Sequence, residues 1–533
     1  MRATLSLFTF HLSFIYRLAL VLISAVSFAL TSPNELALNG FGPLGFISLV
    51  PLAIALYHTK GFGQFSLLLF CFNAVRTAIS SYWLLFFFEF GLLTYSSTTI
   101  GVGIAGMIGL SFLYFIKDKP AIFRALWFAL LWTLYEYMQS RGYWAYPWGL
   151  IAYSLHTMPL FNQIVDSTGP WGLSFIFALI NACLAELIIT FTKTGNLKRS
   201  FNKLKALLLV TCSLFLITLT YGTIRYFSYF SHDKQVNLLL SQQDLDTWFT
   251  GDIQNVTAHI NVSLEALAAN PGFYPDLIVS GETIISGNYF ENFSRYFPTN
   301  FTLQDFIAYT NTYHLIGSRW QGTLGDHNGT LLVNNRGEVL ARYAKRHLVP
   351  MAEGFPLTNF DWAFLFFENV LGISPAWQPG NMDTLFVLPT RHGDTIYFTT
   401  PICYEDAFSY ITRHQARLGA DLFITPTNDA WSRREVAMQQ HLVASLFRPI
   451  ETRRTLARAA NAGITAIIDE RGRITQQIEP FTDMALLAEL NLHTTTTTFY
   501  VKFGDWLIAV FIIILLLQLK KLYWPGKLFK KND

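Results

Sequence analysis

Residues 394–408 read DTIYFTTPICYEDAF, an extended apolar run that leads to Cys403 and then to two carboxylates, Glu405 and Asp406. The β-branched and aromatic residues of this run predict a strand that ends near the cysteine. Negative charge beside a thiol disfavours its ionised form, so the setting is unusual for a nucleophile. The surrounding sequence has to explain why a cysteine stands at this position.

The predicted strand lies in a polar stretch, about 232–495, whose composition differs from that of the rest of the chain. Strand-like runs alternate there with segments of helical character, which predicts one α/β domain. The runs are VNLLLS, DLIVSGE, YHLIGSRW, GTLLVNN, VLARYAK, DTIYFTTPICYE, DLFITPTND and ITAIIDE.

The composition of the whole chain predicts a membrane protein. Of the 533 residues, 52% are hydrophobic and only 14% are charged, which is too apolar for an ordinary soluble protein. The net charge of +3 gives no reason to expect nucleic acid as a partner. Apolar runs close to the length that crosses a bilayer lie at 12–31, 41–58, 64–91, 97–116, 121–139, 168–192, 206–226 and 503–519.

These runs predict about eight transmembrane helices. About seven belong to an N-terminal membrane domain, 1–231, which precedes the α/β domain at 232–495. The last helix and a basic tail form 496–533. Arg17 interrupts the first run, and no small-x-small cleavage site follows it, so we expect this run to be retained.

Basic residues in the short loops predict the orientation, because Lys and Arg mark the cytoplasmic side. They follow the second, fourth, sixth and eighth runs, so all of them fall on one side of the membrane. Both termini are therefore expected in the cytoplasm and the α/β domain outside it. The loop residues are Lys60, Lys117, Lys119, Arg124, Lys193, Lys198, Arg199, Lys203 and Lys205.

Cys403 differs in its surroundings from the other three cysteines. Cys71, Cys183 and Cys212 lie inside apolar runs, where a thiol packs as a small hydrophobic group. Cys403 is alone in the polar domain and cannot form a disulfide within it. It is either a reactive thiol or a buried structural one.

Two other segments supply what a cysteine nucleophile needs, a proton acceptor and a positive group for the oxyanion. DLIVSGET places Glu282 at the end of a strand, and RYAKRHLVPMAEGFP places Lys345 at the end of another. Taken singly, Glu282 would be a surface carboxylate and Lys345 part of a solvated face. Together with Cys403, and in this order, they indicate a catalytic site.

Glu282, Lys345 in YAKRHLVP and Cys403 in ICYE resemble the Glu-Lys-Cys triad of the nitrilase, or carbon-nitrogen hydrolase, superfamily. Longer phrases, set between seven apolar runs and an eighth, are similar to the apolipoprotein N-acyltransferase family over nearly the whole chain. These phrases are YAKRHLVPMAE, ICYEDAF, TNDAW, ARAANAGITAIIDERG, YPWGLIAYS and STGPWGLSF.

The resemblance implies an αββα sandwich on the periplasmic side of a bacterial inner membrane. It implies that Cys403 takes an acyl chain from a phospholipid, with Glu282 as general base and Lys345 stabilising the oxyanion. The amine of a diacylglyceryl-cysteine on an apolipoprotein then accepts the chain, which is the last step of lipoprotein maturation. The expected partners are these two substrates and membrane lipids. We expect a monomer with no cofactor, no metal and no nucleic acid.

The resemblance also implies supporting residues around the triad. Glu353 matches the acid of the pattern HLVPxxE, and Asn428 and Asp429 either shape the pocket or form a capped turn. The remaining candidates are Tyr404, Glu405, Trp248, Arg458 and Asn461. The chain departs from the family pattern at Ser280-Gly281, Thr425 and Ser432, which leaves its acyl-chain and head-group preference open.

Two further readings of the whole chain are a membrane-tethered nitrilase-like hydrolase, in which water resolves the thioester, and an inactive lipoprotein-binding module. Within the domain, 351–380 is expected either to gate acyl-chain access as a mobile loop or to pack as an amphipathic helix. A thiol that rests protonated removes the conflict with Glu405 and Asp406, if Glu282 takes the proton during attack. Glu405 is then expected to orient the pocket, and Asp406 to cap the following helix.

Overall fold

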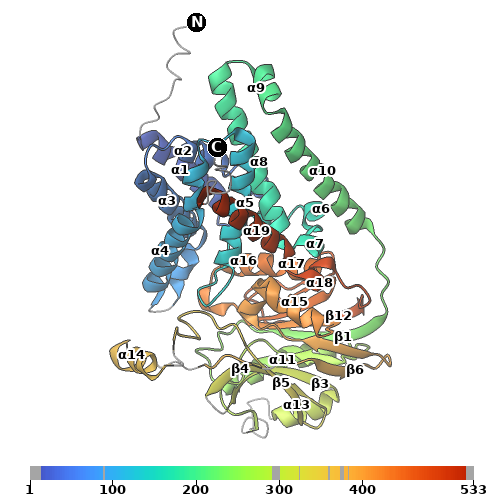
Figure 1. The fold of residues 1–533 in the computed structure, drawn as a ribbon. Helices are drawn as coiled ribbons and strands as arrows, with labels where there is room; N and C mark the ends of the chain where they lie inside the picture. Colours follow the sequence, from blue (N-terminus) through green and yellow to red (C-terminus); the bar gives the residue numbers. More distant parts are fainter. Residues whose placement is uncertain are drawn as a thin grey trace, which may run out of the picture.

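The computed structural model describes residues 14–87, 90–290, 301–322, 325–357, 360–371, 377–381 and 383–523. A bundle of apolar helices stands above an α/β sandwich in Figure 1. The basic residues of the predicted tail from 524 onward lie outside the described residues. The sandwich runs from β1 to β12, between the helices α10 and α18.

All eight predicted apolar runs coincide with helical segments. These are α1 (Phe14–Ala29), η2 (Gly42–Phe46) with α2 (Val50–Tyr57), α3 (Phe62–Ser80), α4 (Gly91–Leu110) with η5 (Ser111–Ile116), α5 (Ala121–Gln139), α8 (Pro170–Thr194), α10 (Lys205–Phe227) and α19 (Trp506–Tyr523). Among the described residues, four helices are long and apolar enough to cross a membrane: α3, α4 with η5, α8 and α10. The prediction of eight spans is thus supported for four helices.

Helix α5 has the length of a span but carries charged residues that find partners inside the bundle. Arg124 forms an ion pair with Glu186 of α8 at 2.5 Å. Glu136, on the same helix, is fully buried and accepts hydrogen bonds from Trp132 Nε1 at 2.9 Å and the Ile151 amide at 2.8 Å. Pairing of this kind is what permits ionisable groups between membrane helices.

Two six-stranded sheets form the sandwich, in the orders β12-β1-β2-β3-β4-β5 and β11-β10-β9-β8-β7-β6. Strands β1, β2 and β3 pair in parallel, as do β7, β8 and β9. The strands are β1 (Lys234–Gln242), β2 (Leu277–Val279), β3 (Tyr313–Gln321), β4 (Asp326–Val333), β5 (Val339–Ala344), β6 (Phe386–Pro389), β7 (Thr395–Thr399), β8 (Leu422–Asn428), β9 (Thr455–Asn461), β10 (Ala466–Ile468), β11 (Ile474–Gln477) and β12 (Met484–Leu492).

Alternate side chains of both sheets meet in a shared core, which includes Leu238, Leu240, Ile396 and Phe398. Helices α11 (Asp252–Ala269) and α13 (Leu303–Thr310) cover the first sheet. Helices α15 (Ser409–Arg417), α16 (Glu435–Ser445) and α17 (Phe447–Thr452) cover the second and lie between it and the membrane bundle (Figure 1). Their apolar faces join the core of the bundle. The expected αββα sandwich is therefore present.

Shorter elements connect these layers. They are η3 (Tyr82–Phe86), η6 (Ile151–Leu155), α6 (Pro159–Asn162), α7 (Val165–Thr168), α9 (Leu197–Lys203), α14 (Asp361–Leu371), η7 (Cys403–Ala407), η8 (Ala430–Ser432) and α18 (Phe499–Phe503). Helix α9, which lies among the basic loop residues, is at the end of the bundle remote from the sandwich (Figure 1). Helix α14 stands apart from the sandwich, on the side of α4.

The strand predicted at 394–405 is shorter than expected. It ends at Thr399, and Cys403 begins the turn η7. Pro401 has no amide hydrogen with which to continue the ladder. The nucleophile candidate therefore lies on a tight turn beyond the strand rather than on the strand itself.

Candidate active site

Cys403 occupies a strained turn at the end of β7. Its backbone φ is +48°, a left-handed conformation that is costly for a residue with a Cβ. The Glu405 carboxylate stabilises this turn by accepting a hydrogen bond from the Ile402 amide at 2.8 Å. Cys403 is 9% exposed and lines a cavity.

Glu405 also connects the cysteine turn to the loop that follows β5. Its carboxylate accepts hydrogen bonds from the Arg346 amide at 2.7 Å, the His347 amide at 3.1 Å and the Tyr343 hydroxyl at 3.0 Å. Burial raises the pKa of Glu405 to about 7, although the backbone donors oppose this rise. Glu405 thus joins the cysteine turn to the loop after β5, while its expected role in orienting the pocket stays a prediction.

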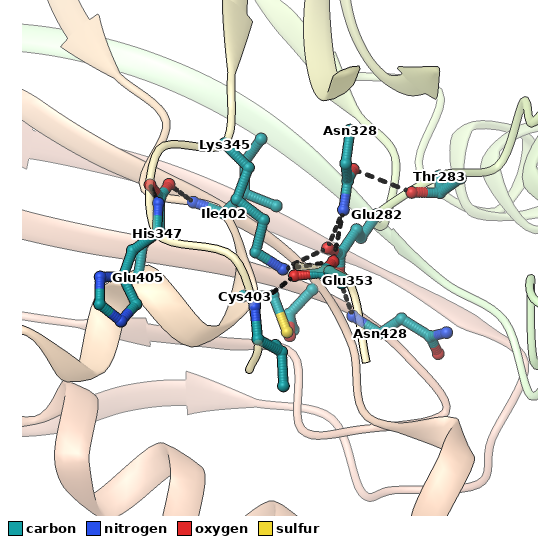
Figure 2. Close-up of polar contacts among 12 residues, drawn as sticks. Glu282, Thr283, Asn328, Lys345, His347, Glu353, Ile402, Cys403, Glu405 and Asn428 are labelled. Carbon is teal, nitrogen blue, oxygen red and sulfur yellow. Dashed lines mark hydrogen bonds and ion pairs between the residues drawn. The ribbon is translucent and has the colours of Figure 1, made fainter. Parts of the chain in front are cut away.

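Lys345 lies between two buried carboxylates, as Figure 2 shows. Its Nζ donates to Glu282 Oε1 at 3.0 Å and to Glu353 Oε1 at 2.9 Å. Asn328 Nδ2 donates to the same two oxygens, at 2.7 and 2.9 Å. Burial by itself lowers the pKa of Lys345, but the two carboxylates outweigh burial and hold it well above its usual value. The lysine is therefore a permanent cation beside Cys403.

Backbone and side-chain donors from the second sheet hold Glu282 in place. The Asn428 amide donates to Glu282 Oε2 at 2.9 Å, and Asn461 Nδ2 donates to the Glu282 carbonyl at 2.8 Å. A Cβ at position 281 would lie 2.0 Å from Asn461 Oδ1. Gly281, one of the departures from the family pattern, therefore leaves the space that Asn461 occupies.

The thiol of Cys403 rests protonated in this environment. Burial raises its pKa well above the usual value, and the Glu282 carboxylate raises it further, while Lys345 opposes both. A nucleophilic role for this thiol would therefore require a nearby base that removes the proton during attack. Glu282 and Lys345 both line the same cavity as Cys403.

Asp406 does not cap the following helix, so that prediction is wrong. Helix α15 begins after Phe408, and no side chain caps it. The Asp406 carboxylate instead lies 3.0 Å from His441 Nε2 and 3.4 Å from Arg458 Nε. These partners come from α16 and β9, whose positions could not be read from the local sequence.

Asp429 contacts the same two residues from the end of β8. Its carboxylate lies 2.8 Å from His441 Nδ1 and 2.9 Å from Arg458 Nη2. Burial raises its pKa, but Arg458 and His441 lower it to about 2. Cys403, Asp429 and His441 have ligand atoms within 4.8 Å of one another. They do not fit a metal, because each ring nitrogen faces a carboxylate and a guanidinium already neutralises Asp429.

A cavity of about 1470 Å³ extends from the triad to the membrane helices. Its far wall is formed by Thr94, Ser97, Gly101, Ile104 and Ile108 of α4 and by Tyr135 and Met138 of α5. Aromatic side chains line another part of it, namely Trp83, Phe87, Trp248 and Trp431. The cavity is thus apolar over most of its length, and its ionisable lining residues in the described part of the chain include Arg141, Glu282, Lys345, Glu353, Asp429 and His441.

Tyr404 joins the cysteine turn to the membrane domain. Its hydroxyl donates to the Ala145 carbonyl at 2.5 Å, and its ring stacks on Trp148 with 5.3 Å between centroids. In addition, the Tyr143 hydroxyl donates to the Gly354 carbonyl at 2.5 Å. The loop between α5 and η6 is therefore part of the site.

Known proteins share both halves of this architecture. The family model described as "Apolipoprotein N-acyltransferase N-terminal domain" matches residues 24–183. The family model described as "Carbon-nitrogen hydrolase" matches residues 308–500. The "Apolipoprotein N-acyltransferase 2" proteins of Treponema denticola and Treponema pallidum are 32% and 31% identical to the chain. The alignments cover 96% of this chain and 97% of the first relative, and 92% of this chain and of the second.

The chain belongs to the apolipoprotein N-acyltransferase family. It is therefore an acyltransferase, and its sandwich is a carbon-nitrogen hydrolase domain joined to a membrane domain. A third relative, the "Apolipoprotein N-acyltransferase" of Borreliella burgdorferi, is 28% identical over 93% of both chains.

Most of the expected site residues of this acyltransferase come together around the cavity. Glu282, Lys345 and Cys403 line it, and so do the supporting candidates Glu353, Tyr404, Trp248, Asn428 and Asp429. Glu405 lies behind it. Ser432 lines the cavity, whereas Thr425 is buried within β8. Sequence reasoning missed Asn328 and His441, whose only local signal was a polar side chain on a segment that is otherwise buried.

Proposed function

We propose that the protein transfers an acyl chain from a phospholipid to the N-terminal amine of the diacylglyceryl-cysteine of apolipoproteins. The transfer passes through a thioester on Cys403. The observation that carries this proposal is the single cavity that joins the Glu282-Lys345-Cys403 cluster to the face of α4 and α5. A site for a small polar amide would not require an apolar path to membrane helices.

In the first half-reaction, Cys403 Sγ attacks the ester carbonyl of the phospholipid and its proton passes to Glu282. The Lys345 ammonium stabilises the oxyanion that forms on the carbonyl oxygen. When the C–O bond breaks, Glu282 returns the proton to the departing alkoxide. The products are a lysophospholipid and acyl-Cys403.

In the second half-reaction, the neutral amine of the acceptor cysteine attacks the thioester carbonyl. Glu282 takes a proton from the nitrogen, and the C–S bond breaks to release an amide. The proton passes to the leaving thiolate and restores Cys403. Division into two steps replaces one difficult ester-to-amide transfer with two easier ones.

Both substrates keep their chains in the bilayer, since drawing a chain into water costs about 0.8 kcal/mol per methylene. The aromatic group of Trp83, Phe87, Trp248 and Trp431 suits the boundary between lipid and water. The basic loop around α9 lies at the opposite end of the bundle. We therefore place the sandwich on the periplasmic side of a bacterial inner membrane and both termini in the cytoplasm.

Mass spectrometry tests the proposal directly. Purified protein is incubated with phospholipid alone and then with a synthetic diacylglyceryl lipopeptide, and Cys403→Ala serves as the matched control. We expect acyl-Cys403 after the first step and N-acylated peptide after the second. Acyl-enzyme that yields only free fatty acid would show a hydrolase, and no acyl-enzyme at all would refute the thioester.

A further inference from the structure

Four buried side chains form a compact cluster against the cysteine turn. They are Asp406, Asp429, His441 and Arg458. None of them is more than 6% exposed. His441 lies between the two carboxylates, with Nδ1 2.8 Å from Asp429 and Nε2 3.0 Å from Asp406. The Arg458 guanidinium approaches the same two carboxylates, at 2.9 and 3.4 Å.

The charges of this cluster balance only if His441 carries a proton. Two carboxylates and one guanidinium alone would leave a net negative charge buried in the protein, which is costly. Burial lowers the pKa of His441 and Arg458 lowers it further, but Asp406 and Asp429 outweigh both and raise it to about 9. With His441 protonated, the four charges of the cluster sum to zero. Arg458 Nη2 also lies 2.7 Å from His441 Nδ1, so the guanidinium and the ring are in direct contact.

His441 also contacts the nucleophile turn itself. Its Nε2 lies 3.2 Å from the carbonyl oxygen of Cys403, whose backbone is held at a φ of +48°. A ring nitrogen of His441 and the Sγ of Cys403 lie within 4.8 Å of each other. His441 therefore contacts the strained turn at the Cys403 carbonyl and lies close to the Cys403 thiol.

We propose that His441 is a positioning residue for Cys403. Its imidazolium neutralises Asp406 and Asp429 and holds the Cys403 carbonyl in place. The proposal rests on the thioester function above. His441 does not act as the base, because both ring nitrogens already face carboxylates. Without its charge, a buried net negative charge faces Sγ while the sulfur and the oxyanion become negative, which slows acylation.

Charge rescue separates this role from a merely structural one. The test compares the single-turnover rate of acyl-Cys403 formation from phospholipid in the unmodified protein, in His441→Gln and in the double variant His441→Gln/Asp406→Asn. We expect His441→Gln to be slower by about tenfold or more, equivalent to at least one unit of thiol pKa. The double variant is neutral again and should recover most of that loss. A double variant no faster than His441→Gln would overturn the proposal.

The pH profile of the unmodified protein gives a second measurement that does not depend on how the variants fold. The groups that face His441 are Cys403 and Asp406 from η7, Asp429 from the end of β8 and Arg458 from β9. The acylation rate should fall as pH rises through about 9, where His441 loses its proton. A rate that stays level or rises between pH 8 and about 10 would refute the proposal.

The same assay distinguishes the two proposals. If the unmodified protein forms no acyl-Cys403, the thioester function itself fails. If the unmodified protein is acylated and folded His441→Gln is acylated at the same rate, only the role of His441 fails.

Discussion

Lys345→Met removes the cation that two buried carboxylates share, while keeping a side chain of similar length. Glu282 and Glu353 would then face each other with only Asn328 between them, since both now direct Oε1 at the lysine Nζ. Neither carboxylate is exposed enough to recover its solvation from water. The substitution should therefore reduce stability as well as activity.

The two losses can be estimated separately. Breaking a buried ion pair by removing one partner costs about 3–5 kcal/mol. For a domain of this size, that corresponds to a fall in the apparent melting temperature on the order of 10 °C. Loss of the group that we propose to stabilise the oxyanion should slow acylation by about 10²–10³. Stability and chemistry thus depend on the same ammonium for different reasons.

A second substitution distinguishes them. Lys345→Met/Glu353→Gln removes one carboxylate, so most of the lost stability should return while acylation remains slow. The assays are thermal unfolding in detergent and single-turnover acylation followed by intact-protein mass spectrometry. The reasoning is refuted if Lys345→Met melts and reacts like the unmodified protein, or if the double variant recovers its acylation rate together with its stability.

Three other predictions follow from particular contacts. Gly281→Ala would push a Cβ against Asn461, and by displacing Glu282 it should slow acylation at least about tenfold. Gly272→Ala is the control: a Cβ there meets nothing within 4 Å, so this variant should be acylated at the normal rate. Burial lowers the pKa of His259 to about 4, so as the pH falls the unfolded chain binds a proton on this residue before the folded protein does. The free energy of unfolding should therefore decrease by about 1.4 kcal/mol for each pH unit as the pH falls from about 6.5 to about 4. If the melting temperature of His259→Gln depends on pH as steeply as that of the unmodified protein, this prediction is wrong. If Asp361–Leu371 gates the cavity, its amides should exchange hydrogen much faster than those of β1, and equal protection would favour a packed helix.

The interdomain contacts explain why the supporting residues were harder to predict than the triad. Tyr404 was expected near the site from its place beside Cys403, but its stacking on Trp148 depends on how the membrane domain meets the sandwich. Asp406 was expected to cap a helix because local capping is the commonest use of such a residue. Its partners His441 and Arg458 lie on elements that only the packed sheet brings near it.

The sequence by itself determined the apolar helices and the family, and it named the three residues that we propose for the chemistry. Spans follow from the length of apolar runs, and Glu282, Lys345 and Cys403 are each fixed by a short motif at or near a strand end, so both kinds of signal are local. The tertiary structure alone decided which polar groups compensate one another. Burial makes a charge costly until a partner neutralises it, and the partners of Lys345, Asp406 and Asp429 come from segments that folding brings together across two sheets and a layer of helices.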